Sequence, residues 1–162
     1  MDKAIKFLHL VGMALFLGSI AVFTLISELI KDSTLPDLAF GRAITSSGIA
    51  YITLPGLWLV VASGLFMVLR GRGLSEAWLK LKLALAFLIV LNAHFIIVPA
   101  ANRALAAATA SVEAGSLSPV FRKALLTESA AGGINVAMAL AAMIAGVVKF
   151  RRKRQKDTET PK

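Results

Sequence analysis

The sequence predicts an all-α protein: an integral membrane four-helix bundle whose long third and fourth helices form a hairpin projecting beyond the membrane. First, 57% of the 162 residues are hydrophobic and the mean hydropathy is +0.77, whereas soluble domains are about 45–50% apolar. Second, four stretches are long and apolar enough to cross a bilayer. Third, lysine and arginine are distributed unevenly between the segments that join these stretches.

The four apolar stretches lie at 4–30, 48–69, 79–101 and 133–150, within one domain of residues 1–150. A hydrocarbon core about 30 Å thick is crossed by about 20 residues of α-helix, so each stretch can form one span. We expect the first span to be retained rather than cleaved as a signal peptide, because its apolar run is longer than a signal sequence needs.

The basic residues predict the orientation of the chain. Thirteen of the 18 lysines and arginines fall in the N-terminus, the second loop and the C-terminal region, and five fall on the other side. The positive-inside rule therefore predicts that both termini are cytoplasmic, in a multi-pass protein of a bacterial-type plasma (inner) membrane. Residues 151–162 are expected to form a basic cytoplasmic tail. We interpret the basic balance as contact with the lipid bilayer, with no nucleic-acid partner.

Local signals predict helices that outrun the membrane. Pro36 follows Asp32-Ser33-Thr34, which is typical of a helix start, and Ser118-Pro119 is a second such signal. The third helix should continue through 104–108, which leaves a turn at 113–118 around Gly115. Pro55 lies in the middle of the second span and predicts a kink there.

A stripe of small residues runs along the fourth span at a spacing of four: Gly133, Ala137, Ala141 and Ala145. Small residues allow another helix backbone to approach closely. The stripe is expected either to pack within the bundle or to form a homodimer contact.

Both histidines of the chain, His9 and His94, fall inside predicted spans. An ionisable residue in a span usually faces the protein interior, and imidazole is a common axial ligand of haem iron. His9 would lie about 7–8 Å from the cytoplasmic end and His94 about 22 Å from it. This offset disfavours ligation of one haem by both histidines of one protomer. His9 is the first candidate ligand and His94 the second, for haem or for another metal.

Other residues could complete a haem site at the depth of His9. The thioethers of Met143 and Met67 are candidate sixth ligands, with core packing as the alternative. Basic residues could hold the haem propionates or could be interfacial anchors; they are Arg70, Arg72, Lys80 and Lys82.

A different constellation could bind a divalent metal near the outer side, because His94, Glu28 and Glu128 share that depth. Glu128 could instead pair with Arg103 or Arg122. The absence of cysteine excludes thiolate and iron–sulfur sites. Signatures of phosphate-binding loops, zinc sites and nucleophilic triads are absent from the sequence.

Three short motifs resemble the HemJ-type protoporphyrinogen oxidases and related small membrane proteins of unknown function. The first predicted helix opens with a lysine, then His9, then glycines. The second helix contains Arg42, Pro55 and Gly64. The third helix opens with Trp78-Leu79-Lys80-Leu81-Lys82-Leu83, similar to the family's Trp-Leu-His-Val-Lys-Leu. The resemblance implies a four-helix membrane protein that binds haem b, with His9 as a ligand and Lys82 as the matched lysine. It also implies oxidation of protoporphyrinogen to protoporphyrin.

The sequence departs from this family at two places. Lys80 stands where the family has a histidine, and the family's Arg-x-x-Asn-Glu-x-Pro segment is not kept after Arg122. We therefore expect a membrane-embedded haem-b-binding protein with a redox role, which resembles a protoporphyrinogen oxidase. The alternative is a non-enzymatic membrane protein for metal handling, assembly or interaction.

Overall fold

The computed structural model describes residues 3–70 and 76–158, and all the regular structure in this part of the chain is helical. In chain order the helices are α1 (Lys3–Leu29), α2 (Leu35–Gly48), the π-helical η1 (Ile49–Thr53), α3 (Leu54–Arg70), α4 (Ala77–Asn92), the π-helical η3 (Ala93–Ile97), α5 (Val98–Ala114) and α6 (Pro119–Thr158).

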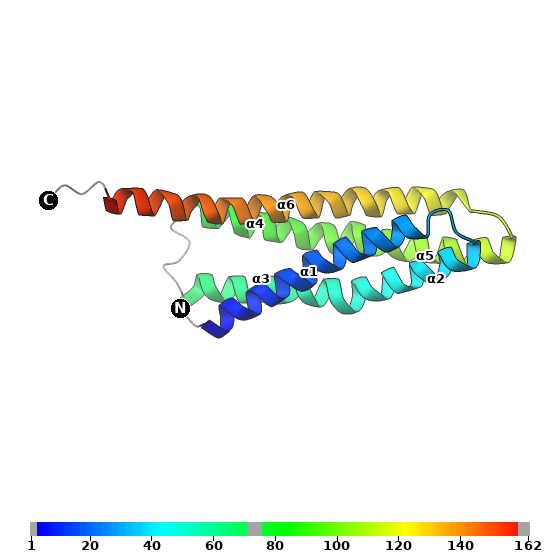
Figure 1. Ribbon diagram of the computed structural model, residues 1–162, viewed down its shortest axis with the longest axis horizontal. Coiled ribbons are helices and arrows are strands. Elements are labelled where there is room, and N and C mark those ends of the chain that lie inside the picture. Colours follow the sequence, from blue (N-terminus) through cyan, green and yellow to red (C-terminus); the bar gives the residue numbers. More distant parts are fainter. Residues whose placement is uncertain (1–2, 71–75, 159–162) are drawn as a thin grey trace.

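The eight elements make four rods: α1, α2–η1–α3, α4–η3–α5 and α6 (Figure 1). Each rod is long and apolar enough to cross a membrane, which confirms the predicted count of four. The first rod begins, and the last rod ends, at the same end of the bundle (Figure 1). We call this the terminal end, and the opposite end, which carries the turn at Gly115, the hairpin end.

The predicted helix starts and turn are confirmed. Thr34 caps α2, since its hydroxyl accepts a hydrogen bond from the Asp37 amide, and Pro36 follows in the first turn. Gly115 ends α5 with φ of 65°, a left-handed conformation that glycine adopts without strain. Pro119 then begins α6.

The stretch 48–69 is the later part of a continuous rod that begins at Leu35, in agreement with the helix start expected near Pro36. The first part of the predicted tail 151–162 is helical, because α6 runs on without a break to Thr158; residues 159–162 lie outside the described part. Helix propagation explains this extension, because each further residue adds a backbone hydrogen bond.

Each of the two central rods contains one π-helical turn just before a proline. Proline has no N–H, and its ring collides with the carbonyl group four residues earlier. Widening the helix by one residue relieves this collision: the Leu54 amide donates to the Ile49 carbonyl, and Pro55 follows. The same pattern occurs where the Val98 amide donates to the Ala93 carbonyl before Pro99. The kink expected at Pro55 is therefore a π-turn, and Figure 1 shows the rod bent there.

A seam of glycines joins α1 to the α2–η1–α3 rod. The rod presents glycines at intervals of seven or eight residues, and residues spaced seven apart along α1 and in the turn directly after it lie against them. The pairs are Ile30 on Gly41, Phe23 on Gly48, Phe16 on Gly56 and His9 on Gly64. A repeat of seven is the spacing that keeps one stripe of a helix against a partner. His9 is the one polar member of this stripe.

At the middle of the seam the two backbones are in contact. A Cβ atom added to Gly56 would lie 2.9 Å from the Phe16 amide nitrogen and 3.2 Å from the Gly12 carbonyl oxygen. The hydroxyls of Ser19 and Thr53 share a hydrogen bond of 2.9 Å across the same seam. These contacts fix the height and rotation of α1 on the rod.

The α4–η3–α5 rod and α6 form a second layer, held by an amide pair. The Asn92 side chain donates to the Ala131 carbonyl at 2.8 Å and to the Asn135 side-chain oxygen at 2.7 Å. Asn135, which is 0% exposed, donates to the Ile89 carbonyl at 3.4 Å. Buried amides satisfied in this way fix the register of two antiparallel helices.

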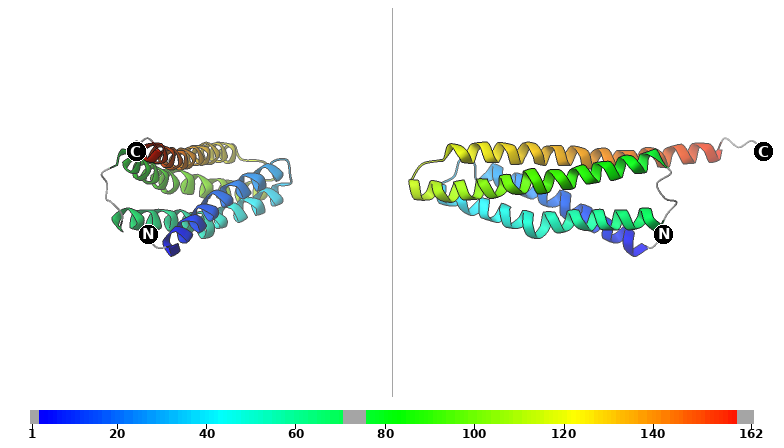
Figure 2. Two further views of the ribbon diagram at one scale, coloured as in Figure 1. Left: turned by 60° about the vertical axis from the view of Figure 1, so that its left-hand side comes forward. Right: turned by 180° about the vertical axis from the view of Figure 1, so that it is seen from behind.

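The two layers pack together in the middle and at the hairpin end. The middle cluster joins all four rods; its buried members are Phe16, Leu57, Ile89 and Ala93, with Met138 and Ala139 against them. The hairpin-end cluster contains Leu38, Ala104, Ala107, Ala108, Phe121 and Ala124. Toward the terminal end the pair α1 and α3 diverges from the pair α4 and α6 (Figures 1 and 2).

The small-residue stripe of α6 lies mostly on the outside of the bundle. Gly133, Ala137 and Ala141 are exposed, Ala145 is half-buried, and no atom lies within 4 Å of a Cβ added to Gly133. Packing within the bundle therefore does not account for the stripe as a whole. The homodimer contact stays a prediction.

We expect Gly56→Leu to lower the melting temperature of the detergent-purified protein strongly, because no space exists for the side chain and backbone atoms cannot move aside. Overpacking of this kind costs about 1–3 kcal/mol or more. Gly18→Leu is the matched control on α1, where a Cβ atom meets nothing within 4 Å. Equal melting temperatures for the two variants would contradict the close packing of α1 on Gly56.

Candidate functional site

The His9 side chain lies between α1 and α3 at the terminal end of the bundle. Its Nδ1 atom is 3.1 Å from the Val60 carbonyl oxygen and 3.0 Å from the Ser63 hydroxyl oxygen. The Ser63 hydroxyl itself donates to carbonyl oxygens of its own helix. A carbonyl oxygen only accepts, so Nδ1 is assigned as the protonated nitrogen. The lone pair of the neutral ring then lies on Nε2.

The glycine seam sets the position of this ring. His9 lies one turn before Gly12, whose own Cβ would lie 3.0 Å from the Gly56 carbonyl oxygen. At the level of the imidazole, a Cβ added to Gly64 would lie 3.4 Å from His9 Cε1. Two features therefore hold the half-buried ring: the close approach of α1 and α3 at Gly12 and Gly56, and the hydrogen bond at Nδ1.

Lys82 approaches the same region from the second layer. Its ammonium group lies against Gly146 of α6, since a Cβ atom added to Gly146 would be only 2.6 Å from Nζ. The same Nζ atom lies 5.6 Å from the centre of the Trp78 ring. The charge is close enough to act electrostatically on the His9 ring. Among the described residues, Lys82 forms no ion pair with a carboxylate. A half-buried lysine in an apolar span without a carboxylate is a place where an anionic group would be stabilised.

His9 belongs to one layer and Lys82 to the other, toward the end where the two layers part (Figure 1). The residues of the two buried clusters belong to the middle and to the hairpin end, and neither cluster includes a residue beside His9 or Lys82. Residues from all four rods contribute here: His9 of α1, Ser63 and Gly64 of α3, Lys82 of α4 and Gly146 of α6. Sequence reasoning found His9 and Lys82 but not their partners.

The second histidine has separate surroundings. His94 lies in η3, and its Nδ1 atom bonds the Val90 carbonyl of its own rod at 3.1 Å. Its ring stands edge-on to Trp58 of α3, with 5.6 Å between the ring centres and 69° between the planes. No neighbour recorded for His94 is also a neighbour of His9.

The other candidate haem residues differ in how exposed their side chains are. Met143 is 41% exposed and Met67 is half-buried. Arg70 and Lys80 are exposed, and the Arg70 guanidinium lies 5.1 Å from the centre of the Phe66 ring. Arg72 lies outside the described residues.

The predicted metal constellation of His94, Glu28 and Glu128 is not assembled. Glu28 pairs with Lys31, and this hydrogen bond raises the pKa of Lys31 above its usual value. Glu128 pairs with Arg42. Within 3–70 and 76–158, no group of three or more histidine, cysteine, aspartate or glutamate residues could hold a metal ion. Each carboxylate is closer to a base than to His94, which explains the difference.

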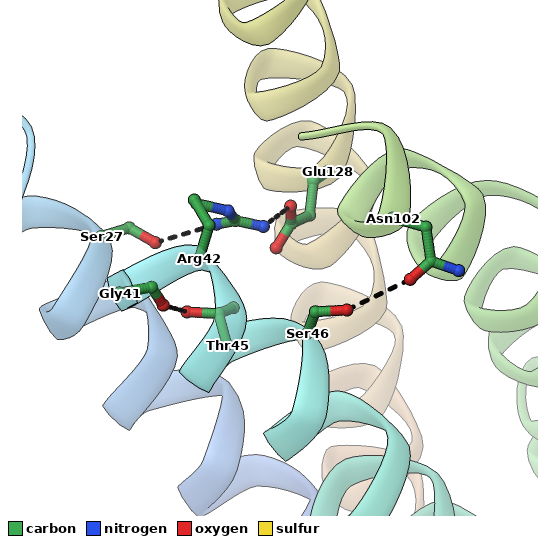
Figure 3. Close-up of polar contacts among 7 residues, drawn as sticks. All are labelled: Ser27, Gly41, Arg42, Thr45, Ser46, Asn102 and Glu128. Atoms are coloured by element: carbon green, nitrogen blue, oxygen red, sulfur yellow. Dashed lines mark hydrogen bonds and ion pairs between the residues drawn. The ribbon is translucent and has the colours of Figure 1, made fainter. Parts of the chain in front are cut away.

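The partner of Glu128 also differs from the expected Arg103 or Arg122, both of which are exposed. Arg42 is 1% exposed and lies between Glu128 of α6 and Ser27 of α1, with 3.4 Å from its Nη1 to the Ser27 hydroxyl (Figure 3). Its Nε atom has no hydrogen-bond partner among the residues that the structure describes. Sequence reasoning missed this pair because Arg42 carries no local sign of burial beyond its small neighbours Gly41 and Ala43.

The ion pair ties the two layers together near the hairpin end. A second polar contact supports it, in which the Ser46 hydroxyl of α2 donates to the Asn102 side-chain oxygen of α5 at 3.1 Å (Figure 3). Buried pairs that are broken on one side leave an uncompensated charge, which is costlier than the loss of both partners. The pair is therefore a structural contact of the fold.

Comparison with known proteins adds no family assignment. No protein-family model, no curated protein and no solved structure matches the chain.

We expect Glu128→Leu to destabilise the purified protein by about 3–5 kcal/mol, because Arg42 is left buried and unpaired. The double variant Arg42→Met/Glu128→Leu should recover part of this loss. Thermal unfolding in detergent is measured for Glu128→Leu, for Arg42→Met and for the double variant, with Glu113→Leu as the control because Glu113 is exposed. A double variant as unstable as the sum of the two single variants would show that Arg42 and Glu128 are not coupled.

Proposed function

We propose that the protein is a membrane-embedded haem-b-binding protein with a redox role, in which His9 Nε2 would bind the iron. One observation carries the proposal: the Val60 carbonyl holds Nδ1 of a half-buried imidazole and leaves the lone pair on Nε2. Histidines that bind metals are usually oriented in this way, by a hydrogen bond from the opposite ring nitrogen to a carbonyl or carboxylate.

The surroundings of His9 fit a flat apolar group. Gly64 places no side chain against the ring, and the helix layers part at this end of the bundle (Figure 1). The apolar faces of a bound porphyrin would pack against the helices that flank His9.

Lys82 supports haem over a purely apolar ligand. Haem b carries two carboxylates on one edge, and Lys82 is a half-buried cation without a carboxylate partner among the described residues. We propose that its ammonium group binds a propionate. Trp78 and Gly146 hold the lysine where its charge acts on the region of His9.

When bound, the haem would supply one-electron exchange at its iron. The residues of this chain would perform the remaining tasks. The Val60 carbonyl fixes the His9 ring and would make Nε2 more electron-rich, while Lys82 would neutralise a haem carboxylate and so favour the reduced state of the iron. The apolar spans around them would exclude water.

The resemblance to HemJ-type protoporphyrinogen oxidases adds a candidate substrate class. We propose protoporphyrinogen oxidation as the finer role, because His9 and Lys82 are both positions that match the family motifs. The proposal for haem rests on the surroundings of His9 and does not depend on this finer role.

We place the terminal end on the cytoplasmic side of a plasma membrane, as the charge distribution predicts. The candidate spans of the two central rods, Leu35–Arg70 and Trp78–Ala114, contain 36 and 37 residues, which corresponds to about 54–56 Å of helix. Because the hydrocarbon core is about 30 Å thick, the excess supports a hairpin end that projects beyond the membrane. His9 and Lys82 would then lie in the cytoplasmic half of the bilayer.

We expect the protein purified in mild detergent from haem-supplied cells to show a Soret band that shifts on reduction with dithionite. His9→Ala should lose this band, because the iron loses its protein ligand. His94→Ala is the matched control, since its imidazole has other neighbours, and it should keep the band.

Added imidazole should restore part of the band to His9→Ala, which separates a missing ligand from a misfolded protein. A folded wild-type protein without a Soret band would remove haem from the account. Retention of the full band in His9→Ala would remove His9 as the ligand.

Lys82→Met should lower the midpoint potential of the bound haem, because loss of a positive charge disfavours the reduced state. We expect a shift on the order of 30 mV, which is about a threefold change in the equilibrium constant. Lys82→Arg, which keeps the charge, should stay near the wild-type value. Spectroelectrochemical titration measures all three, and an unchanged potential in Lys82→Met would exclude the contact with a propionate.

A further inference from the structure

A second polar feature of the spans is not used by the proposed haem site. The His94 imidazole lies in the π-helical segment η3 and donates its Nδ1 proton to the Val90 carbonyl. A carbonyl oxygen accepts only, so the lone pair of the neutral ring lies on Nε2. Within the part of the chain that the structure describes, no hydrogen bond to Nε2 is recorded.

This nitrogen lies at the rim of the bundle rather than in its core. His94 is half-buried, and the Trp58 ring, against which it stands edge-on, is 49% exposed. The next residue, Phe95, is 74% exposed. A molecule dissolved in the hydrocarbon could reach this place from the side, without opening the helix pairs.

An imidazole with one unsatisfied nitrogen is costly in a membrane span, because hydrocarbon offers no hydrogen bonds. The π-turn is the second observation, since such turns often occur at functional sites and here it carries the histidine itself. Packing alone explains the contact with Trp58 but gives no reason for a polar ring at this position.

The chemistry of His94 and Trp58 defines the ligand. Nε2 accepts a hydrogen bond, so the ligand donates one through a hydroxyl group. Trp58 presents aromatic surface beside the imidazole, which favours a flat ring. Entry from the hydrocarbon requires an apolar tail. We propose that His94 and Trp58 form a lateral binding site for a lipid-soluble quinol, with a quinol O–H donating to His94 Nε2. The site is independent of His9 and of the haem proposal.

The chain has two tryptophans, so Trp78→Phe leaves Trp58 as the only tryptophan beside the site. We would titrate this variant in lipid nanodiscs with 2-decylhydroquinone under anaerobic conditions and follow Trp58 fluorescence. The dimethyl ether of the same compound has the same ring and tail but no O–H to donate. His94→Leu in the same background removes the acceptor while keeping an apolar side chain.

We expect the quinol to quench Trp58 fluorescence saturably in the Trp78→Phe parent. The dimethyl ether should bind the parent about tenfold more weakly than the quinol does, and the quinol should bind His94→Leu about tenfold more weakly than it binds the parent. Each loss corresponds to one hydrogen bond. Circular dichroism of His94→Leu verifies its helix content. If His94→Leu unfolds, the difference in affinity between the quinol and its dimethyl ether for the parent protein is sufficient to test the hydrogen bond.

Two results would overturn the site. Quenching that is linear in ligand concentration would reflect collision in the bilayer only. Saturable quenching with equal affinity for the quinol and its dimethyl ether would show that no hydrogen bond to His94 forms. Neither result depends on a Soret band, so failure of the quinol site and failure of the haem proposal can be told apart.

Discussion

The arrangement of the bundle depends on the contact between α1 and the glycines of the α2–η1–α3 rod. Glycine at 41, 48, 56 and 64 removes the side chains that would keep the two helices apart, and the seven-residue repeat on α1 fills the space with one residue per glycine. The hydrocarbon around a membrane protein offers no hydrophobic drive for helix association, so close packing of this kind holds helices together. Three of the four packed residues are apolar, and the fourth is His9.

This seam explains how a polar ring is tolerated at the terminal end. The Gly12 and Gly56 backbones are in contact, which brings the Val60 carbonyl within hydrogen-bond distance of His9 Nδ1. The second layer is fixed separately, by Asn92 and Asn135, and is tied to the first by the middle cluster and the Arg42–Glu128 pair. Because those ties lie in the middle and toward the hairpin end, the terminal end is where the layers are free to diverge around His9 and Lys82.

The fold was largely predictable from the sequence because its signals are local. Apolar runs, Thr34, Gly115 and Pro119 each act within one or two helical turns, and the structure confirms the helices they indicate. The contacts between helices were not predictable in the same way. Arg42 carries the same charge as Arg103 and Arg122, and only the tertiary packing decides which of the three pairs with Glu128. Pro99 carried a signal equal to that of Pro55, and the π-turn before it could have been expected.

In the candidate site, too, the local features were predictable from the sequence and the contacts between helices were not. His9 and Lys82 stand out as ionisable residues in apolar spans, and span position is visible in the sequence. The hydrogen bonds of His9 to Val60 and Ser63 join residues more than fifty positions apart, so no local pattern could reveal them. The spacing of the glycines is visible in the sequence. That they form a contact with α1 could be recognised only once the structure showed which residues of α1 lie against them.

The central claim is that His9 alone among the histidines of this chain binds the iron of a haem. The most direct test is a nitrogen hyperfine measurement, by pulsed electron paramagnetic resonance, on oxidised His94→Ala protein in which only histidine carries ¹⁵N. Because His9 is then the one histidine of the chain, the account predicts a strong ¹⁵N coupling to the iron. Bound haem without ¹⁵N coupling would show that another residue or no residue of the protein is the ligand, and would contradict the account.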